Sequence, residues 1–149
     1  MCPDVVVVGA GNAALCAALA AREAGASVAV LEAAPRAERG GNSAFTGGAM
    51  RVPFSGEGAL RALMPDLTED EIESADFGSY SEQEFFADMA RVSEHRADAD
   101  LLEVLVAHSS DTLLWMRDHG VRFEPSYGRQ AFKVDGRFRF WGGLVLEVN

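Results

Sequence analysis

The sequence predicts an α/β fold that opens with a β-strand, a helix and a second β-strand. Three observations predict it. Four consecutive valines, Val5–Val8, lead directly into the glycine-rich turn of residues 9–14. Residues 12–24 are rich in Ala and Leu, the composition of a buried helix that ends at a glycine. The apolar segment Val28–Leu31 then reads as a parallel strand, and we expect both strands to be covered on both faces.

The turn has the layout of a dinucleotide-binding motif. Gly9 permits the tight turn, Gly11 lets the backbone approach a pyrophosphate, and Ala14 is a small residue where a third glycine is common. The helix that begins at Asn12 offers free N–H groups to that phosphate. Glu32, about twenty residues on, is placed to accept hydrogen bonds from a ribose. The pattern predicts a Rossmann-like βαβ unit, and the alternative is such a unit without a nucleotide.

Composition limits the classes of function. The chain has 149 residues, enough for one domain with a core, and 48% of them are hydrophobic. A formal net charge of −10 argues against general nucleic-acid binding. No apolar run is long enough to insert into a membrane, and the two cysteines form no metal-ligand pattern. We therefore expect a cytoplasmic protein with reduced thiols and no metal site.

A second glycine-rich stretch follows the acid. Residues 39–50 read Arg-Gly-Gly-Asn-Ser-Ala-Phe-Thr-Gly-Gly-Ala-Met, so two glycine pairs bracket small polar residues. Such a backbone can approach a ligand closely while amide and hydroxyl groups donate to it. Alone, the stretch is equally consistent with a flexible loop. After a nucleotide motif, it predicts a second ligand-binding loop.

Together the two motifs resemble FAD-dependent proteins of the fumarate reductase/succinate dehydrogenase flavoprotein superfamily. Within this superfamily, the sequence of these motifs resembles that of the tricarballylate dehydrogenases. The resemblance continues through residues 77–81, 85–92 and 114–123, and thus covers essentially the whole chain. Ketosteroid Δ1-dehydrogenases carry a similar loop followed, as here, by a Val-Pro pair (Val52-Pro53), and fumarate-type reductases are a further alternative.

The resemblance implies a bound FAD. Because the second loop contains no histidine for covalent attachment, we expect non-covalent FAD. The residues that the resemblance places against the pyrophosphate, the ribose and the flavin side of the cofactor are Gly9, Gly11, Asn12, Ala13, Ala14, Glu32, Ala33, Gly40, Gly41, Asn42, Ser43, Thr46, Gly47 and Gly48.

The resemblance also implies a reaction. A small di- or tricarboxylate such as tricarballylate would lose two hydrogens across a carbon–carbon bond beside a carboxylate, with hydride passing to the flavin. A separate electron-transfer protein would reoxidise the flavin, in the cytoplasm or at the inner membrane surface through that partner. The alternatives are a truncated nucleotide-binding module without catalysis, and a nicotinamide-linked dehydrogenase. Relatives in this superfamily are longer, so we expect an incomplete domain, an N-terminal fragment.

The rest of the chain divides by composition. We expect residues 1–63 to be the beginning of the FAD-binding domain, 64–120 a helical segment, and 121–149 the start of a β-rich, substrate-facing region. Capping boxes at Thr68 and Ser81 predict two helix starts. A third helix is predicted from Asp98 or Asp100 to Gly120.

The last segment predicts a short strand at 121–123 and a β-hairpin at 132–140, which turns at Asp135-Gly136. Its polar positions are basic. Arg137 and Arg139 are our candidate substrate anchors, because guanidinium groups bind carboxylates bidentately. The alternative is an exposed hairpin face kept in water by Lys133, Arg129 and these two arginines. The sequence assigns no catalytic acid or base.

Overall fold

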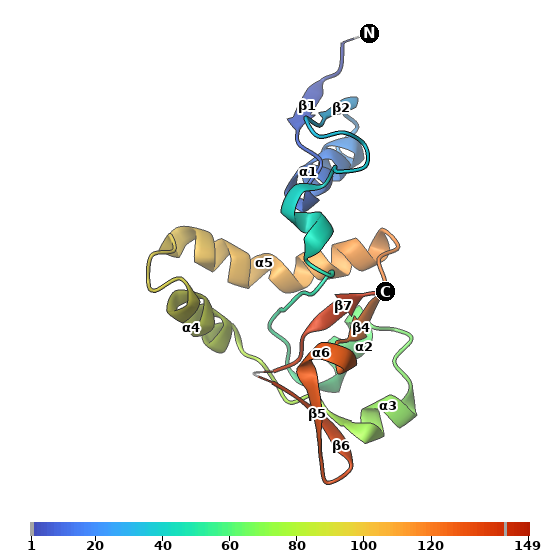
Figure 1. Ribbon diagram of the computed structural model, residues 1–149, viewed down its shortest axis with the longest axis vertical. Coiled ribbons are helices and arrows are strands. Elements are labelled where there is room, and N and C mark those ends of the chain that lie inside the picture. The colour runs from blue at the N-terminus through green and yellow to red at the C-terminus, as the bar shows by residue number, and fades with distance from the viewer. Residues whose placement is uncertain (1, 142) are drawn as a thin grey trace. The chain divides into compact units, whose positions relative to one another are not determined.

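The computed structural model describes residues 2–141 and 143–149. The chain divides into two compact units, Met1–Gly48 and Ala49–Asn149, which are described separately (Figure 1). The division predicted at residue 63 therefore differs from the one observed. The reason is that Val52 and Phe54, 4% and 7% exposed, belong to the hydrophobic core of the second unit.

The first unit is a strand–helix–strand arrangement followed by a single 3₁₀ turn. Strand β1 (Val5–Val8) leads into helix α1 (Asn12–Glu23), and β2 (Val28–Leu31) returns parallel to β1 in the register Val5 to Val28. The 3₁₀ helix η1 spans Gly41–Phe45. Helix α1 stops as predicted, at Gly25, whose φ is +87°. The α/β class is confirmed, whereas the wider sheet of a Rossmann-like domain is not seen in the residues described.

The expectation that these elements are buried on both faces was wrong. Val8 is 82% exposed and Leu31 is 56% exposed, and Ala18 is the buried residue of α1. Within the described part of the chain, β1 and β2 pair with each other alone and α1 is the helix that contacts them. Their apolar side chains therefore lack the second layer that a parallel sheet ordinarily has.

The second unit is mainly helical. The helices predicted after Thr68, Ser81 and Asp98 are confirmed, whereas α2 and α6 were not predicted. The five helices of this unit are α2 (Gly56–Leu63), α3 (Glu69–Ser74), α4 (Glu82–Val92), α5 (Ala99–Asp118) and α6 (Tyr127–Gln130). Over residues 2–141 and 143–149, no helix combines the length and apolar character needed to cross a bilayer.

Two small sheets complete this unit. Strand β6 pairs in parallel with β3 and antiparallel with β5, and β4 pairs antiparallel with β7. The strands are β3 (Ala75–Asp76), β4 (Phe123–Pro125), β5 (Ala131–Val134), β6 (Arg137–Phe140) and β7 (Leu146–Val148). The predicted hairpin is confirmed, with φ of +50° at Asp135 and +83° at Gly136.

The strand predicted at 121–123 begins two residues later. The N–H of Val121 donates to the carbonyl of Met116 at 3.1 Å, so this residue still closes the end of α5. Pairing with β7 begins at Phe123, which lies opposite Val148, and the carbonyl of Arg122 accepts one further hydrogen bond from the N–H of Asn149 at 3.0 Å.

The segment that follows the second glycine stretch runs through the middle of the second unit. Met50 exchanges two backbone hydrogen bonds with Leu146, each 2.8 Å long. Phe54 exchanges two with Tyr80, at 2.8 and 3.1 Å. The segment therefore joins β7 to the chain before α4, and its apolar side chains pack into the shared core around Leu60.

The capping box of α4 should contribute measurably to stability. The Ser81 hydroxyl accepts from the Glu84 N–H at 3.2 Å, and the Glu84 carboxylate accepts from the Ser81 N–H at 2.7 Å. We expect Ser81→Ala to lower the free energy of unfolding by about 1 kcal/mol in urea titrations. Ser79→Ala is the control, because Ser79 is exposed and has no hydrogen bond in the described chain. Equal stability of the two variants would contradict the assignment.

Candidate functional site

The first unit brings the two glycine-rich stretches together. The N–H of Asn12, at the start of α1, donates to the hydroxyl of Ser43 at 3.0 Å, across 31 positions in the sequence. A Cβ built on Gly11 would lie 3.5 Å from the carbonyl oxygen of Gly40 and 3.6 Å from Ser43 Oγ. The absence of a side chain at Gly11 therefore leaves a narrow space between the two loops.

Two of the glycines set the course of these loops. Gly9 has a φ of +106°, and its N–H donates to the carbonyl of Leu31 at 2.6 Å, so the chain turns away from β1 while still attached to β2. Gly40 has a φ of +101° where the chain enters η1. Residues with a Cβ are strained at such angles. Both turns therefore depend on glycine.

The N-terminus of α1 has the properties of an anion site. Its N-cap, Gly11, provides no side-chain cap, and the first turn carries no acid. In the part of the chain described, the N–H groups of Ala13 and Ala14 have no acceptor. Such first-turn groups carry the positive end of the helix dipole and bind phosphate.

Glu32 lies against the same turn. Its Oε2 accepts from the N–H of Ala10 at 2.8 Å, and its Oε1 accepts from the N–H of Ala34 at 2.9 Å. The hydrogen bond from Ala34, followed by those from Ala10 and Ala33, lowers the pKa of the Glu32 carboxyl. The group is thus a charged acceptor with lone pairs left for a hydroxyl ligand.

The second loop presents exposed donors beside this turn. Residues 41–47 are exposed, and they include Asn42 with its side-chain amide. The hydroxyl of Thr46 donates to the Ser43 carbonyl at 3.2 Å and accepts from the Gly48 N–H at 3.4 Å. The loop predicted from the sequence as either flexible or ligand-binding is thus an internally bonded turn.

Comparison with known proteins agrees with this geometry. Residues 4–144 match the family of the FAD binding domain. The chain belongs to this family. The predicted FAD cofactor is therefore confirmed.

Several curated relatives are similar to this FAD binding domain. It is 35% identical over 121 residues to the digoxin reductase of Eggerthella lenta, covering 81% of this chain and 19% of that protein. It is 29% identical over 140 residues to a probable fumarate reductase of Shewanella frigidimarina, covering 94% and 21%. It is 32% identical over 126 residues to the urocanate reductase of Eggerthella lenta, covering 82% and 18%. The chain thus spans about a fifth of the length of these relatives.

The cradle formed by the two loops fits an FAD pyrophosphate and ribose. It combines a side-chain-free approach at Gly11, two free amides on α1 and an ionised acceptor at Glu32. The predicted residues that the structure places on these two loops and beside them are Gly9, Gly11, Asn12, Ala13, Ala14, Glu32, Ala33, Gly40, Gly41, Asn42, Ser43, Thr46, Gly47 and Gly48. All of them lie in the first unit of the FAD binding domain.

The basic residues of the hairpin do not converge on one point. Arg139 pairs with Asp76 at 3.3 Å, and Arg137 donates to the carbonyl of Ala75 at 2.6 Å. Lys133 lies opposite Phe138 in the register, and its Nζ is 4.6 Å from the centre of that ring. Because side chains alternate along a strand, Lys133 and Phe138 share the face of the hairpin that Arg137 and Arg139 do not occupy. Substrate anchoring by Arg137 and Arg139 stays a prediction.

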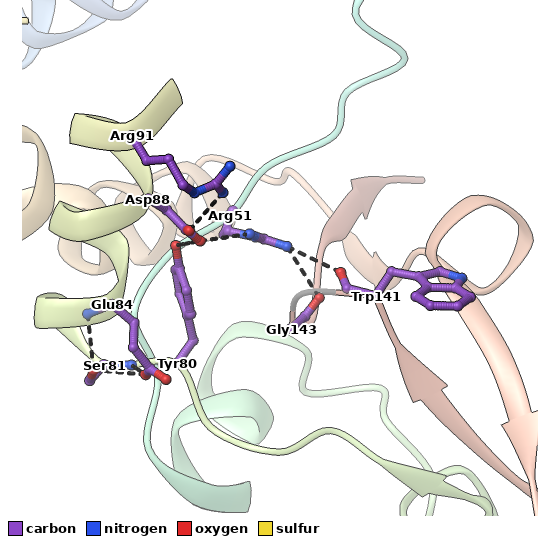
Figure 2. A network of polar contacts seen from close by, with 8 residues as sticks. All are labelled: Arg51, Tyr80, Ser81, Glu84, Asp88, Arg91, Trp141 and Gly143. Atoms are coloured by element: carbon purple, nitrogen blue, oxygen red, sulfur yellow. Dashed lines mark hydrogen bonds and ion pairs between the residues drawn. The ribbon is translucent and has the colours of Figure 1, made fainter. Parts of the chain in front are cut away.

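A polar network in the second unit was missed from the sequence. The side chains that converge on the carboxylate of Asp88 in Figure 2 are those of Arg51, Tyr80 and Arg91. Tyr80 donates to this carboxylate at 2.9 Å and Arg91 at 2.9 Å, and Arg51 lies 3.5 Å from it. Hydrogen bonds from Arg91 and then Tyr80 lower the pKa of Asp88, and burial raises the pKa of Tyr80.

Arg51 also connects this network to the end of the hairpin. Its Nη2 lies 3.4 Å from the carbonyl oxygens of Trp141 and Gly143, and its guanidinium carbon lies 5.0 Å from the centre of the Tyr80 ring (Figure 2). Positions 51, 80, 88 and 141 follow no sequence pattern that would indicate their proximity. The network connects the segment that follows the second loop to α4 and to the carbonyl oxygens of Trp141 and Gly143.

Two glycine variants should separate the effect of backbone strain in the turn from the effect of filling the space between the two loops. Gly9→Ala places a Cβ at a φ of +106°, so we expect a loss of about 1–2 kcal/mol in unfolding free energy. Gly11 has a φ of −76°, so Gly11→Ala should fold with a smaller loss, yet weaken FAD binding more than tenfold by filling the space between the loops. Thermal unfolding and fluorescence titration with FAD measure the two effects. FAD affinity unchanged in Gly11→Ala would exclude this position for the pyrophosphate.

The hydrogen bonds to Glu32 should make stability depend on pH. Because the pKa of Glu32 is lowered by folding, its contribution is complete above the ordinary value of 4.5 and disappears as the pH falls through the folded value. We expect the stability difference between the wild type and Glu32→Gln to shrink when unfolding is measured from pH 7 down to pH 3. Glu38→Gln, at an exposed side chain without a hydrogen bond in the described chain, is the control. A difference independent of pH would refute the assignment.

Proposed function

We propose that this chain is the FAD-holding part of a flavin-dependent oxidoreductase that acts on a carbon–carbon bond beside a carboxylate. The observation that carries the proposal is the junction of the two loops, in which the Asn12 N–H donates to Ser43 Oγ at 3.0 Å. A lone nucleotide turn serves NAD and FAD alike. A second loop seated on that turn, in a chain of the FAD binding domain family, favours flavin chemistry.

The residues of this chain hold and orient the cofactor. The free amides of Ala13 and Ala14 would hold the pyrophosphate, and Glu32 would hold the adenosine ribose. The loop of residues 41–48 would extend along the ribityl chain toward the ring. FAD, when bound, supplies the hydride acceptor, and the protein supplies position and electrostatics.

Non-covalent attachment forms part of the proposal. The second loop carries Asn42 and Ser43 and no histidine, which is the observation that supports it. Acid precipitation of the full-length protein should therefore release all flavin into the supernatant. Flavin that stays with the precipitate would show a covalent bond.

For the substrate, we propose a small di- or tricarboxylate, with tricarballylate as the first candidate. Reduction of an unsaturated carboxylate is the second, since two similar proteins are named for fumarate and urocanate. The two reactions are the same hydride transfer in opposite directions, to the flavin in the dehydrogenation and from the flavin in the reduction. A steroid substrate is the third candidate, since another similar protein is named for digoxin. A separate electron-transfer protein would exchange electrons with the flavin, in the cytoplasm or at the inner membrane surface.

The flavin spectrum of the full-length protein tests these candidates. Under anaerobic conditions, we expect tricarballylate to bleach the oxidised flavin absorbance, or fumarate or urocanate to restore it after reduction with dithionite. Digoxin and a 3-ketosteroid form the comparison set.

Gly11→Ala is the matched control, because its weaker FAD binding should lower the signal in proportion to the flavin lost. A yellow protein whose flavin responds to no carboxylate would overturn the proposed substrate class. A protein that binds no flavin would overturn the oxidoreductase itself.

A further inference from the structure

Helix α1 is capped by a residue from a distant part of the sequence. Its N-cap residue is Gly11, which has no side chain to accept from the first-turn amides. The Ser43 hydroxyl accepts from another first-turn amide, the N–H of Asn12, at 3.0 Å. A serine in η1 thus satisfies one of the amides that a helix leaves without a partner inside itself.

The second loop has few other attachments. No residue of η1 is buried, and the side chain of Phe45 is 89% exposed. The hydrogen bonds of Thr46 are internal to the loop. Between the loop and the nucleotide turn, the described residues show the Ser43–Asn12 hydrogen bond and the close approach of Gly11 to Gly40. Because the remaining contacts are so few, one hydroxyl can control the position of the loop.

We propose that Ser43 is a positioning residue that fixes the second loop on α1 before FAD binds. A hydroxyl has one proton and two lone pairs. In accepting from Asn12, Ser43 keeps its own proton free to donate to a pyrophosphate oxygen at the same helix end. The hydroxyl therefore orders the loop in the empty site and adds a donor in the filled one, so part of the ordering entropy is lost at folding and not at binding.

The inference rests on FAD binding by this family and not on the proposed substrate, so the two can fail separately. Its competitor is a Ser43 that acts as a phosphate ligand alone, with a loop that becomes ordered only when the cofactor arrives. The two differ in the FAD-free protein. Hydrogen exchange of the Asn12 amide and of residues 40–48 in that state therefore distinguishes them.

The experiment uses the full-length protein after removal of FAD, compared as wild type, Ser43→Ala and Ser43→Thr. We expect Ser43→Ala to exchange the Asn12 amide and the loop amides about fivefold faster or more, and to weaken FAD binding by at least the same factor. Ser43→Thr, which keeps the hydroxyl, should restore both. Ser55→Ala is the control, because Ser55 is an exposed N-cap whose hydroxyl makes no cap hydrogen bond.

Three results would overturn the proposal. If the amides of FAD-free Ser43→Ala exchange at the wild-type rate while FAD binding is weaker, Ser43 is a phosphate ligand that does not order the loop. Unchanged exchange and unchanged affinity would show that the hydroxyl has neither role. Failure of Ser43→Thr to restore protection would show that the substitution acts through the backbone and not through the hydroxyl.

Discussion

The first unit depends on one close approach of two backbones. At Gly11 the chain has no Cβ, and the carbonyl oxygen of Gly40 and the hydroxyl of Ser43 lie at ordinary contact distance from the position a Cβ would take. The positive φ of Gly9 brings β1 to this point, and that of Gly40 returns the second loop to it. The free N–H groups of Ala13 and Ala14 lie in the first turn of the helix that starts beside this approach.

The parts of the fold that the sequence predicts are those with local causes. The turn at Gly9, the capping box at Ser81 and the hairpin at Asp135 each depend on residues within a few positions of one another. The joining of the two loops was predicted only from their resemblance to flavoproteins. The position of Ser43 as a cap for α1 has no local signal.

The parts that were missed have distant causes. The Arg51 network joins residues up to 92 positions apart, and a single arginine between apolar residues gives no sign of it. Burial of β1 and β2 was predicted from their composition, yet burial is decided by what packs on them, and the described chain supplies one helix. The extent of β4 depends on its pairing with the distant strand β7, which the local sequence of residues 121–125 does not indicate.

A crystal structure of the full-length protein with FAD tests the central claim most directly, which is that the two glycine loops form a single cradle for the cofactor. We expect pyrophosphate oxygens within hydrogen-bonding distance of the N–H groups of Ala13 and Ala14, with the Ser43 hydroxyl bridging from Asn12 to the same phosphate and the ribose on Glu32. A pyrophosphate bound away from α1, or a second loop that does not contact the cofactor, would contradict it.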